Sequence, residues 1–260
     1  MVKEKSDKKY KVDLREVNIS TVNFCTRKCP YCYFGQIDKS KIKVRFMSLD
    51  LFKKILVDLK KANFEGVVSP FEGNEPLLDK RMPELVKMIS KILPQAKSFI
   101  FSNGDLANED IIKKLFKAGL SRIVFSLHDK KNEKLANDLV KKYSHDKVQI
   151  SKMYGLDPES LHNFAGVVKN DLVSQRNYRN ANCVLPFRQM VIDVNGNVNL
   201  CCVDIADRIS FGNAKDRSAV DIFYHNKKLN NIREQLNKCV RRNPICARCS
   251  FPGVLEIINL

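Results

Sequence analysis

The chain has 260 residues, of which 44% are apolar and 8% aromatic, and its 46 Lys and Arg against 29 Asp and Glu give a formal net charge of +17. This length suits one large domain, or a domain of about 150 residues with a smaller companion. No stretch approaches the roughly 20 apolar residues that a membrane span needs, and from the charged start, MVKEKSDKKYKVDLRE, we expect no secretory signal.

Residues 16 to about 154 alternate short apolar runs with amphipathic stretches, after a charged tail over residues 1–12. The runs that predict strands are EVNISTVNF (16–24), GVVSPF (66–71), SFIFS (98–102), RIVFSL (122–127) and KVQIS (147–151). Helices are expected after the N-cap Ser48, over 82–93, from about Asn108 to Gly119, and near 131–142. This alternation predicts an α/β protein whose parallel sheet forms a partial TIM-type (β/α) barrel.

Residues with chemical potential follow the predicted strands. Three cysteines follow the first strand, EGNEP (72–76) the second, SNGD (102–105) the third, and His128 with Asp129 the fourth. Because the loops at the carboxyl ends of barrel strands build the active site, we expect all four sets to face one mouth.

The pattern changes after residue 154. Residues 155–182 are expected to form a linker or an irregular crossing. QMVIDVNGNVNLC (189–201) predicts a hairpin with Asn195-Gly196 at its turn. Ser218 with Asp221 predicts a capped short helix, KKLNNIREQL (227–236) another, and CVRRNPICARCS (239–250) closes the segment. We therefore expect a barrel over residues 13–170 and a smaller unit over 171–260.

The nine cysteines point to metal or redox chemistry, because thiols stay reduced in the cytoplasm, where we expect the protein to act. The positive charge suits nucleic acid, an acidic substrate or an acidic electron-transfer partner. The lysines are scattered along predicted helices and form no single tract, so we predict neither a nucleic-acid nor a membrane partner.

Cys25, Cys29 and Cys32 form a C-x3-C-x2-C triad that could bind zinc or an iron-sulfur cluster. Zinc usually recruits four ligands in pairs, whereas this loop offers three. A triad leaves one coordination position open, and an open iron can be chelated by another molecule.

The segment CTRKCPYC resembles the signature loop of the radical S-adenosylmethionine (SAM) superfamily, with an aromatic residue before its third cysteine. GNEP (73–76) resembles the family's GGEP motif, and FSNGD (101–105) its third-strand motif. The resemblance implies that the triad holds three irons of a 4Fe–4S cluster whose fourth iron binds the amino and carboxylate groups of SAM.

The same resemblance implies roles for the cofactor-binding residues. Gly73 and Glu75 would meet the methionyl ammonium, Ser102 and Asn103 the ribose or carboxylate, and Tyr31 the adenine side. Asn74, which is also expected to bind the cofactor, stands where the family usually has glycine. His128 is expected to be either a core histidine or a contact to cofactor or substrate.

A second set of cysteines, Cys183, Cys201, Cys246 and Cys249, could by itself form a zinc ribbon. Beside a radical SAM barrel it resembles the Twitch form of the SPASM domain, which implies an auxiliary 4Fe–4S cluster with four thiolate ligands. The spare Cys202 and Cys239 are expected to be small buried residues. Cys202, next to a ligand, could instead return a hydrogen atom to a substrate radical.

The resemblance implies an oxidoreductase that cleaves SAM to a 5′-deoxyadenosyl radical and oxidises a secondary alcohol of a sugar, cyclitol or related small metabolite. An auxiliary cluster would accept the second electron, and a flavodoxin or ferredoxin would donate the first. In alcohol-oxidising relatives an N-R-G-G segment supplies a substrate-holding arginine. This chain has NFAG, with Phe164 in that place, so Arg176, Arg179 or Arg188 could supply the charge.

Two other functions stay open at this point. The first is a radical SAM enzyme that acts on a peptide, as an epimerase or a cross-linking maturase, with Cys202 or Cys239 as hydrogen donor. The second is a zinc-organised protein that binds nucleic acid through its positive charge.

Overall fold

The computed structural model describes residues 9–206 and 209–253. The start of the predicted tail over 1–12 and the end of the predicted unit over 171–260 lie outside the described residues. The strands in the described part are β1 (Glu16–Ile19), β2 (Val67–Ser69), β3 (Lys97–Ser102), β4 (Arg122–Leu127), β5 (Val148–Lys152), β6 (Gln189–Ile192), β7 (Asn197–Asn199) and β8 (Ser210–Asn213).

The helices alternate with the strands in the first part of the chain and follow them in the second. They are α1 (Tyr33–Gln36), α2 (Leu49–Lys61), α3 (Met82–Ile92), α4 (Glu109–Ala118), α5 (Glu133–Tyr143), α6 (Leu185–Arg188), α7 (Ala219–His225), α8 (Lys227–Asn237) and α9 (Pro244–Ala247). Short 3-10 turns lie at Lys39–Lys41, Pro76–Leu78 and Pro158–Ser160. No helix among the described residues is long and apolar enough to cross a membrane.

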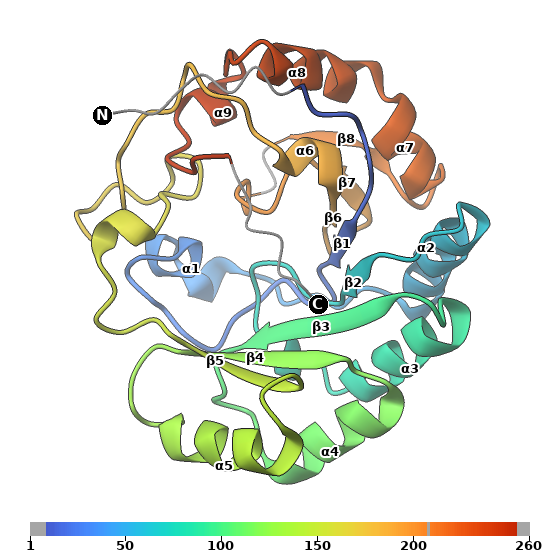
Figure 1. Cartoon of the computed structure of the whole chain (residues 1–260), viewed down its shortest axis with the longest axis vertical. Helices are drawn as coiled ribbons and strands as arrows, with labels where there is room; N and C mark the ends of the chain where they lie inside the picture. Colours follow the sequence, from blue (N-terminus) through green and yellow to red (C-terminus); the bar gives the residue numbers. More distant parts are fainter. Residues whose placement is uncertain (1–8, 207–208, 254–260) are drawn as a thin grey trace.

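One curved sheet runs through the described residues in the order β5-β4-β3-β2-β1-β6-β7-β8. The strands from β5 to β6 are parallel to their neighbours, while β7 and β8 are antiparallel. Helices α2 to α5 lie outside the curve of the parallel strands, as Figure 1 shows. The predicted parallel α/β barrel, open and partial, is therefore confirmed.

The two faces of β1 explain where the core lies. Val17 and Ile19 are fully buried and belong to the apolar core that also holds Phe52 and Leu56 of α2. Side chains of a strand alternate between faces, so Glu16 and the other even-numbered positions of β1 face the inside of the curve. The inner face of the sheet therefore carries polar groups.

The local signals for the helices are confirmed. The Ser48 hydroxyl accepts a hydrogen bond from the Leu51 amide at 3.2 Å and caps α2. Gly119 ends α4 with a φ of +105°, a left-handed conformation that glycine adopts without strain. The Ser218 hydroxyl caps α7 by accepting from the Asp221 amide.

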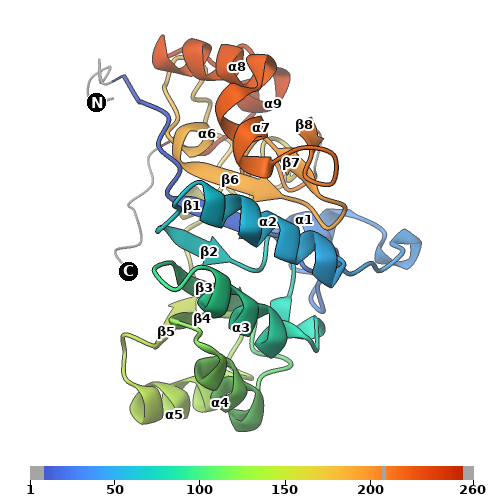
Figure 2. The ribbon, with the colours of Figure 1, turned by 90° about the vertical axis from the view of Figure 1, so that its right-hand side faces the viewer.

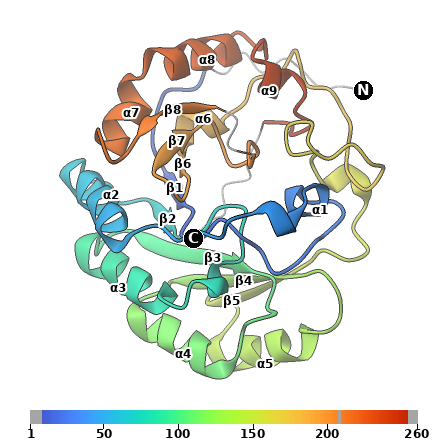
Figure 3. The ribbon, with the colours of Figure 1, turned by 180° about the vertical axis from the view of Figure 1, so that it is seen from behind.

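The predicted hairpin is confirmed, but its place in the sheet was not predicted. Strand β6 pairs antiparallel with β7 and also parallel with β1, in the register from Glu16–Gln189 to Ile19–Ile192. The hairpin thus extends the barrel sheet, and α7 and α8 flank it as α2 to α5 flank the other strands (Figure 3). The division into units at residue 170 stays a prediction.

Candidate active site

The structure gathers the predicted strand-end residues at one end of the sheet, where α1 and its flanking loops lie (Figure 2). Arg27, between the first two cysteines, makes the central connection. Its guanidinium donates two hydrogen bonds to Asp105, at 2.6 and 2.7 Å, and one to Asp129 at 2.7 Å. These bonds lower the pKa of both carboxyls and tie the cysteine loop to the loops after β3 and β4.

Two further residues shape the cysteine loop from within. The Lys39 ammonium donates to the carbonyl oxygens of Cys25, Thr26 and Arg27 and lies 4.4 Å from the ring centroid of Phe24. A Cβ on Gly35 would overlap the carbonyl oxygen of Cys29, so α1 can pack this closely only with glycine there. These contacts brace the loop that carries the triad from within.

Glu75 connects the loop after β2 to the end of β3. It is 1% exposed and accepts hydrogen bonds from the Ser102 hydroxyl at 2.8 Å and the amides of Asn103 at 2.8 Å and Leu77 at 3.1 Å. Burial raises the pKa of Glu75, while these donors oppose that rise. Glu75 and Ser102 thus fix two active-site loops to each other, and their predicted direct contacts to SAM stay predictions.

Replacing Glu75 by glutamine is expected to lower the free energy of unfolding by about 1–3 kcal/mol, because the new amide NH2 would face a buried donor. Urea denaturation measures the loss. The control is Glu65→Gln, since Glu65 is exposed. Equal urea midpoints for the two variants would contradict the role assigned to Glu75.

Asn103 links this network to the cysteines. Its side-chain amide donates to the Thr26 hydroxyl at 2.9 Å and to the sulfur of Cys25 at 3.8 Å. Hydrogen bonds to ligand sulfurs tune the reduction potential of an iron-sulfur cluster. Asn103 is therefore placed to act on the triad itself, in addition to its predicted contact with SAM.

The backbone at Gly73 and Asn74 accommodates an asparagine at position 74, where the family usually has glycine. Gly73 has a φ of +59°, and a Cβ there would overlap the side chain of Ile205. Asn74 does not have a positive φ, and its amide donates to the Val22 carbonyl, so asparagine replaces glycine without backbone strain. Its Oδ1 is buried with no hydrogen-bond partner among the described residues, beside a cavity of about 160 Å³. An open acceptor at this point fits a ligand ammonium.

Tyr31 and His128 meet above the ends of β3 and β4. The Tyr31 hydroxyl lies 2.5 Å from His128 Nδ1, and the two rings stack with centroids 5.9 Å apart. Burial, with the charge of Arg27, lowers the pKa of His128 to about 4, while burial raises that of Tyr31. At neutral pH the imidazole is therefore neutral, and it shares one hydrogen bond with the tyrosine hydroxyl.

The four cysteines of the second set line one small enclosed cavity with Leu236 and Arg241. Burial raises the pKa of Cys183 to about 11, and burial together with the neighbouring thiols raises the pKa of Cys246 to about 12. Bound metal supplies the positive charge that lets such buried thiols become thiolate ligands.

Arg241 organises this second set, and no pattern in the sequence pointed to it. The side chain is 3% exposed and donates to the carbonyl oxygens of Ala181, Asn182, Phe251 and Pro252, at distances between 2.7 and 3.2 Å. It therefore joins the chain before Cys183 to the chain after Cys249, which brings cysteines far apart in sequence to one cavity.

The candidate ligands of both sets are thiols, the groups that hold iron-sulfur clusters in proteins. Among the described residues, no three His, Cys, Asp or Glu side chains converge where one metal ion could sit. In a 4Fe–4S cluster each thiolate binds a different iron, so the sulfurs stay further apart than around one zinc ion. Three thiols in an accessible loop and four around a buried cavity match an open and a closed cluster.

A chain of polar side chains crosses the inner face of the sheet between the two thiol sets; we call it the inner polar series. It consists of Cys202, Gln189, Glu16, Asn18 and Glu72. Gln189 accepts a hydrogen bond from the Cys202 amide at 3.2 Å, and Glu16 is hydrogen-bonded to Gln189 and Asn18. Asn18 donates to Glu72 at 2.9 Å.

Three members of the inner polar series that lie on strands were not predicted from the sequence: Glu16, Asn18 and Gln189. A signal existed, because polar residues at alternate positions of a barrel strand mark its inner face. Cys239, the other spare cysteine, lies just after α8 with a φ of +55° and does not line the cavity of the second thiol set.

The three candidate arginines differ in their contacts. Arg176 pairs with Glu159 at 2.7 Å, and Arg179 donates to the Ala247 carbonyl at 3.4 Å. The Nε of Arg188 is buried with no hydrogen-bond partner among the described residues. Phe164, in place of the family arginine, packs edge-to-face against His162, with the two ring centroids 4.5 Å apart.

Comparisons with known proteins agree with this arrangement. Residues 19–158 match the model of the radical SAM superfamily, and residues 183–250 match the SPASM model, described as an iron-sulfur cluster-binding domain. The S-adenosyl-L-methionine-dependent 2-deoxy-scyllo-inosamine dehydrogenase of Niallia circulans is 28% identical over 241 residues, which cover 92% of this chain and 93% of that enzyme. GTP 3′,8-cyclase of Campylobacter curvus is 34% identical over 131 residues, 48% of this chain and 38% of that enzyme.

Among solved structures, BtrN in complex with AdoMet and 2-DOIA superposes with a TM-score of 0.80 at 25% identity, over 92% of this chain and 94% of that one. A histidine-tagged anSMEcpe with bound AdoMet has a TM-score of 0.61 at 16% identity, over 86% of this chain and 81% of that one, and so shares the fold.

Proposed function

This chain belongs to the radical SAM superfamily, and we propose that it oxidises a secondary alcohol of a sugar, cyclitol or related small metabolite to a ketone. In this proposal the triad around Cys29 holds the cluster that binds SAM, and the set around Cys201 holds an auxiliary 4Fe–4S cluster. When bound, these groups supply the carbon radical and an electron acceptor, and the protein positions them around the substrate.

The observation that carries the proposal is the position of the inner polar series. It begins at Cys202, next to Cys201 of the second thiol set, and ends at Glu72, next to Gly73 in the loop that faces the triad. A substrate bound along this series would lie between the two clusters. Carboxylates and amides suit a small molecule rich in hydroxyl groups.

Alcohol oxidation removes a hydrogen atom, a proton and an electron from the substrate. Glu16 and Glu72 are carboxylates of the inner polar series, and one of them would accept the hydroxyl proton. Burial raises the pKa of Glu16, with hydrogen bonds from Gln189 and Asn18 opposing the rise, which makes its carboxylate a better proton acceptor. The hydrogen atom would go to the nucleoside radical and the electron to the auxiliary cluster.

The likeness to the dehydrogenase of Niallia circulans supports the reaction type, since it extends over 92% of this chain. The difference at Phe164 supports a substrate that is held differently from the substrate of that enzyme. Two buried polar atoms with no hydrogen-bond partner among the described residues, Asn18 Oδ1 and Ser69 Oγ, lie on paired positions of β1 and β2 and offer contacts for such a substrate.

The experiment uses cyclitols, aminocyclitols and sugars that carry deuterium at each carbinol carbon, with SAM and dithionite under anaerobic conditions. We expect one compound class to transfer its deuterium to 5′-deoxyadenosine and to yield a ketone in equal amount. SAM cleavage without ketone from any compound in the panel would contradict the proposal.

Cys202 supports a second candidate function, that of a peptide-modifying enzyme in which this thiol returns a hydrogen atom to the substrate. Its place in the inner polar series, beside the proposed substrate, favours this alternative over one that uses Cys239. Reactions in deuterated water separate the two. We expect Cys202→Ala to retain ketone formation and substrates to gain no deuterium at carbon; epimerised product with solvent deuterium, lost in the variant, would favour the alternative.

A further inference from the structure

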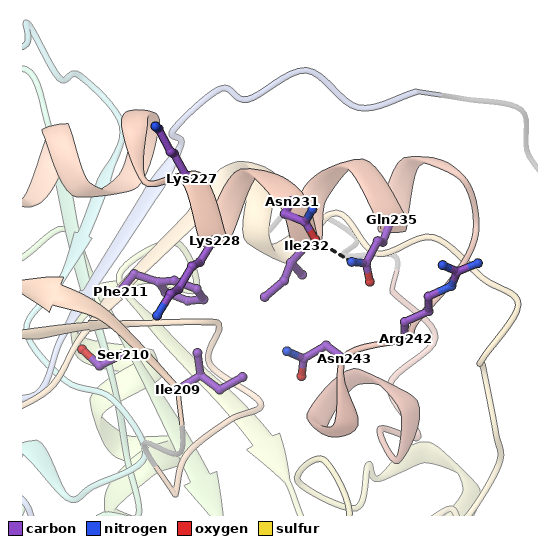
Figure 4. Close-up of a pocket in the computed structure, with 10 residues that line it drawn as sticks. All are labelled: Ile209, Ser210, Phe211, Lys227, Lys228, Asn231, Ile232, Gln235, Arg242 and Asn243. Atoms are coloured by element: carbon purple, nitrogen blue, oxygen red, sulfur yellow. Dashed lines mark hydrogen bonds between the residues drawn. The ribbon is translucent and has the colours of Figure 1, made fainter.

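A groove of about 720 Å³ lies on the outer side of the C-terminal part of the chain, apart from the residues proposed for catalysis. Figure 4 shows it between β8, α8 and the chain that leads into α9. Its lining consists of Ile209, Ser210, Phe211, Lys227, Lys228, Asn231, Ile232, Gln235, Arg242 and Asn243.

The groove is positively charged around an apolar floor. Lys227, Lys228 and Arg242 line it, no described lining residue is acidic, and none of the three cations forms an ion pair with a described residue. Lys228 extends toward Phe211, and Arg242 stands at the opposite end (Figure 4). Unpaired cations that flank apolar side chains complement a partner with an acidic rim.

The groove shares a wall with the cavity of the second thiol set. On α8, Ile232 and Gln235 line the groove, while Leu236 lines the cavity. In the next segment Arg242 lines the groove, while its neighbour Arg241 lines the cavity. One layer of chain therefore separates the surface from the thiols, and electron transfer requires such a short path.

We propose that this groove docks an acidic one-electron carrier protein of the flavodoxin or ferredoxin type, which removes the electron from the auxiliary cluster. This inference rests on the proposed function. In each turnover the substrate carbon loses its hydrogen atom to the nucleoside radical and its hydroxyl loses a proton to a carboxylate. The remaining electron passes to the auxiliary cluster, and the oxidised carrier takes it and becomes reduced by one electron.

The test measures the Kd between the reconstituted holoenzyme and two acidic probes, an oxidised flavodoxin and an oxidised 2Fe–2S ferredoxin. The variant is K228E/R242E, and the control K113E/K117E makes the same change of net charge on α4, where both lysines are exposed. We expect the first pair to raise the Kd of at least one carrier about tenfold or more, and added salt to weaken wild-type binding, as for steered redox complexes. The control is expected to change the Kd less than about twofold.

An unchanged Kd in K228E/R242E, equal weakening in both pairs, or no binding of either carrier would overturn the proposal. Binding of a polyglutamate peptide in place of both carriers would overturn it in favour of an acidic peptide. Formation of 5′-deoxyadenosine with dithionite needs no carrier and should stay at the wild-type level in K228E/R242E. If carrier binding depends on the groove but the enzyme oxidises no alcohol, the docking surface is supported and the proposed function is rejected.

Discussion

Replacing Cys29 by alanine will reduce 5′-deoxyadenosine formation from SAM by at least about 100-fold. Mutation of residues that only support the ligands of a metal site already lowers metal affinity or activity by about 10–100-fold. Cys29 is one of three thiols in a loop that Arg27 and Lys39 hold at the mouth of the barrel. In the proposed function Cys29 is a cluster ligand, so the variant would lose one of the protein ligands of that cluster. The measurement is product analysis after anaerobic incubation with SAM and dithionite.

The matched control for this change is Cys239→Ala, which alters a cysteine that lines neither thiol site. We expect this variant to form 5′-deoxyadenosine at the wild-type rate. Equal rates for Cys29→Ala and Cys239→Ala would show that the triad does not hold the reactive cluster.

Replacing Cys249 by alanine will distinguish the roles of the two clusters. Cys249 is 9% exposed and lines the cavity of the second thiol set. We expect the iron content to fall by about half, because a four-thiolate cluster loses a ligand while the first cluster stays intact. SAM cleavage should persist, but the ketone should disappear because the substrate radical has no electron acceptor. Iron analysis and product analysis on one preparation measure both effects.

Two results would contradict this assignment. A Cys249→Ala protein that retains full iron content would show that Cys249 is not a ligand. A protein that loses half of its iron but still forms ketone at the wild-type rate would show that the second cluster accepts no electron from the substrate.

Local features of the fold were predictable because they depend on neighbouring residues. Ser48 caps α2, Asn108 begins α4 and Gly119 ends it, as their side chains and backbone preferences dictate. The boundaries of strands were less certain. The first strand was predicted over residues 16–24 but ends at Ile19, since the later residues leave the sheet for the cysteine loop.

The pairing of β6 with β1 shows what sequence alone did not predict. The apolar run from Met190 to Ile192 indicates a strand, and the Asn195-Gly196 turn indicates its hairpin partner. No local property of β6 predicts that its second neighbour is β1, about 170 residues away in the sequence. Non-local pairing is decided by how the complete core packs, with Met190 and Ile192 fully buried.

The residues at the strand ends of the site were predictable, whereas the arginines that hold its loops together were not. The order of parallel strands places the cysteine loop, Glu75, Asn103 and His128 at one end of the sheet. Arg27 and Arg241 are ordinary basic residues in the sequence, and only the structure shows which carboxylates and carbonyls surround them.

The most direct test of the account is the electron paramagnetic resonance spectrum of the reduced Cys249→Ala protein, in which the signal comes from the first cluster. In the proposed function SAM binds the open iron of the triad cluster, so we expect added SAM to change this spectrum and 5′-deoxyadenosine to form in the same sample. A spectrum that SAM leaves unchanged, with no 5′-deoxyadenosine, would contradict the account.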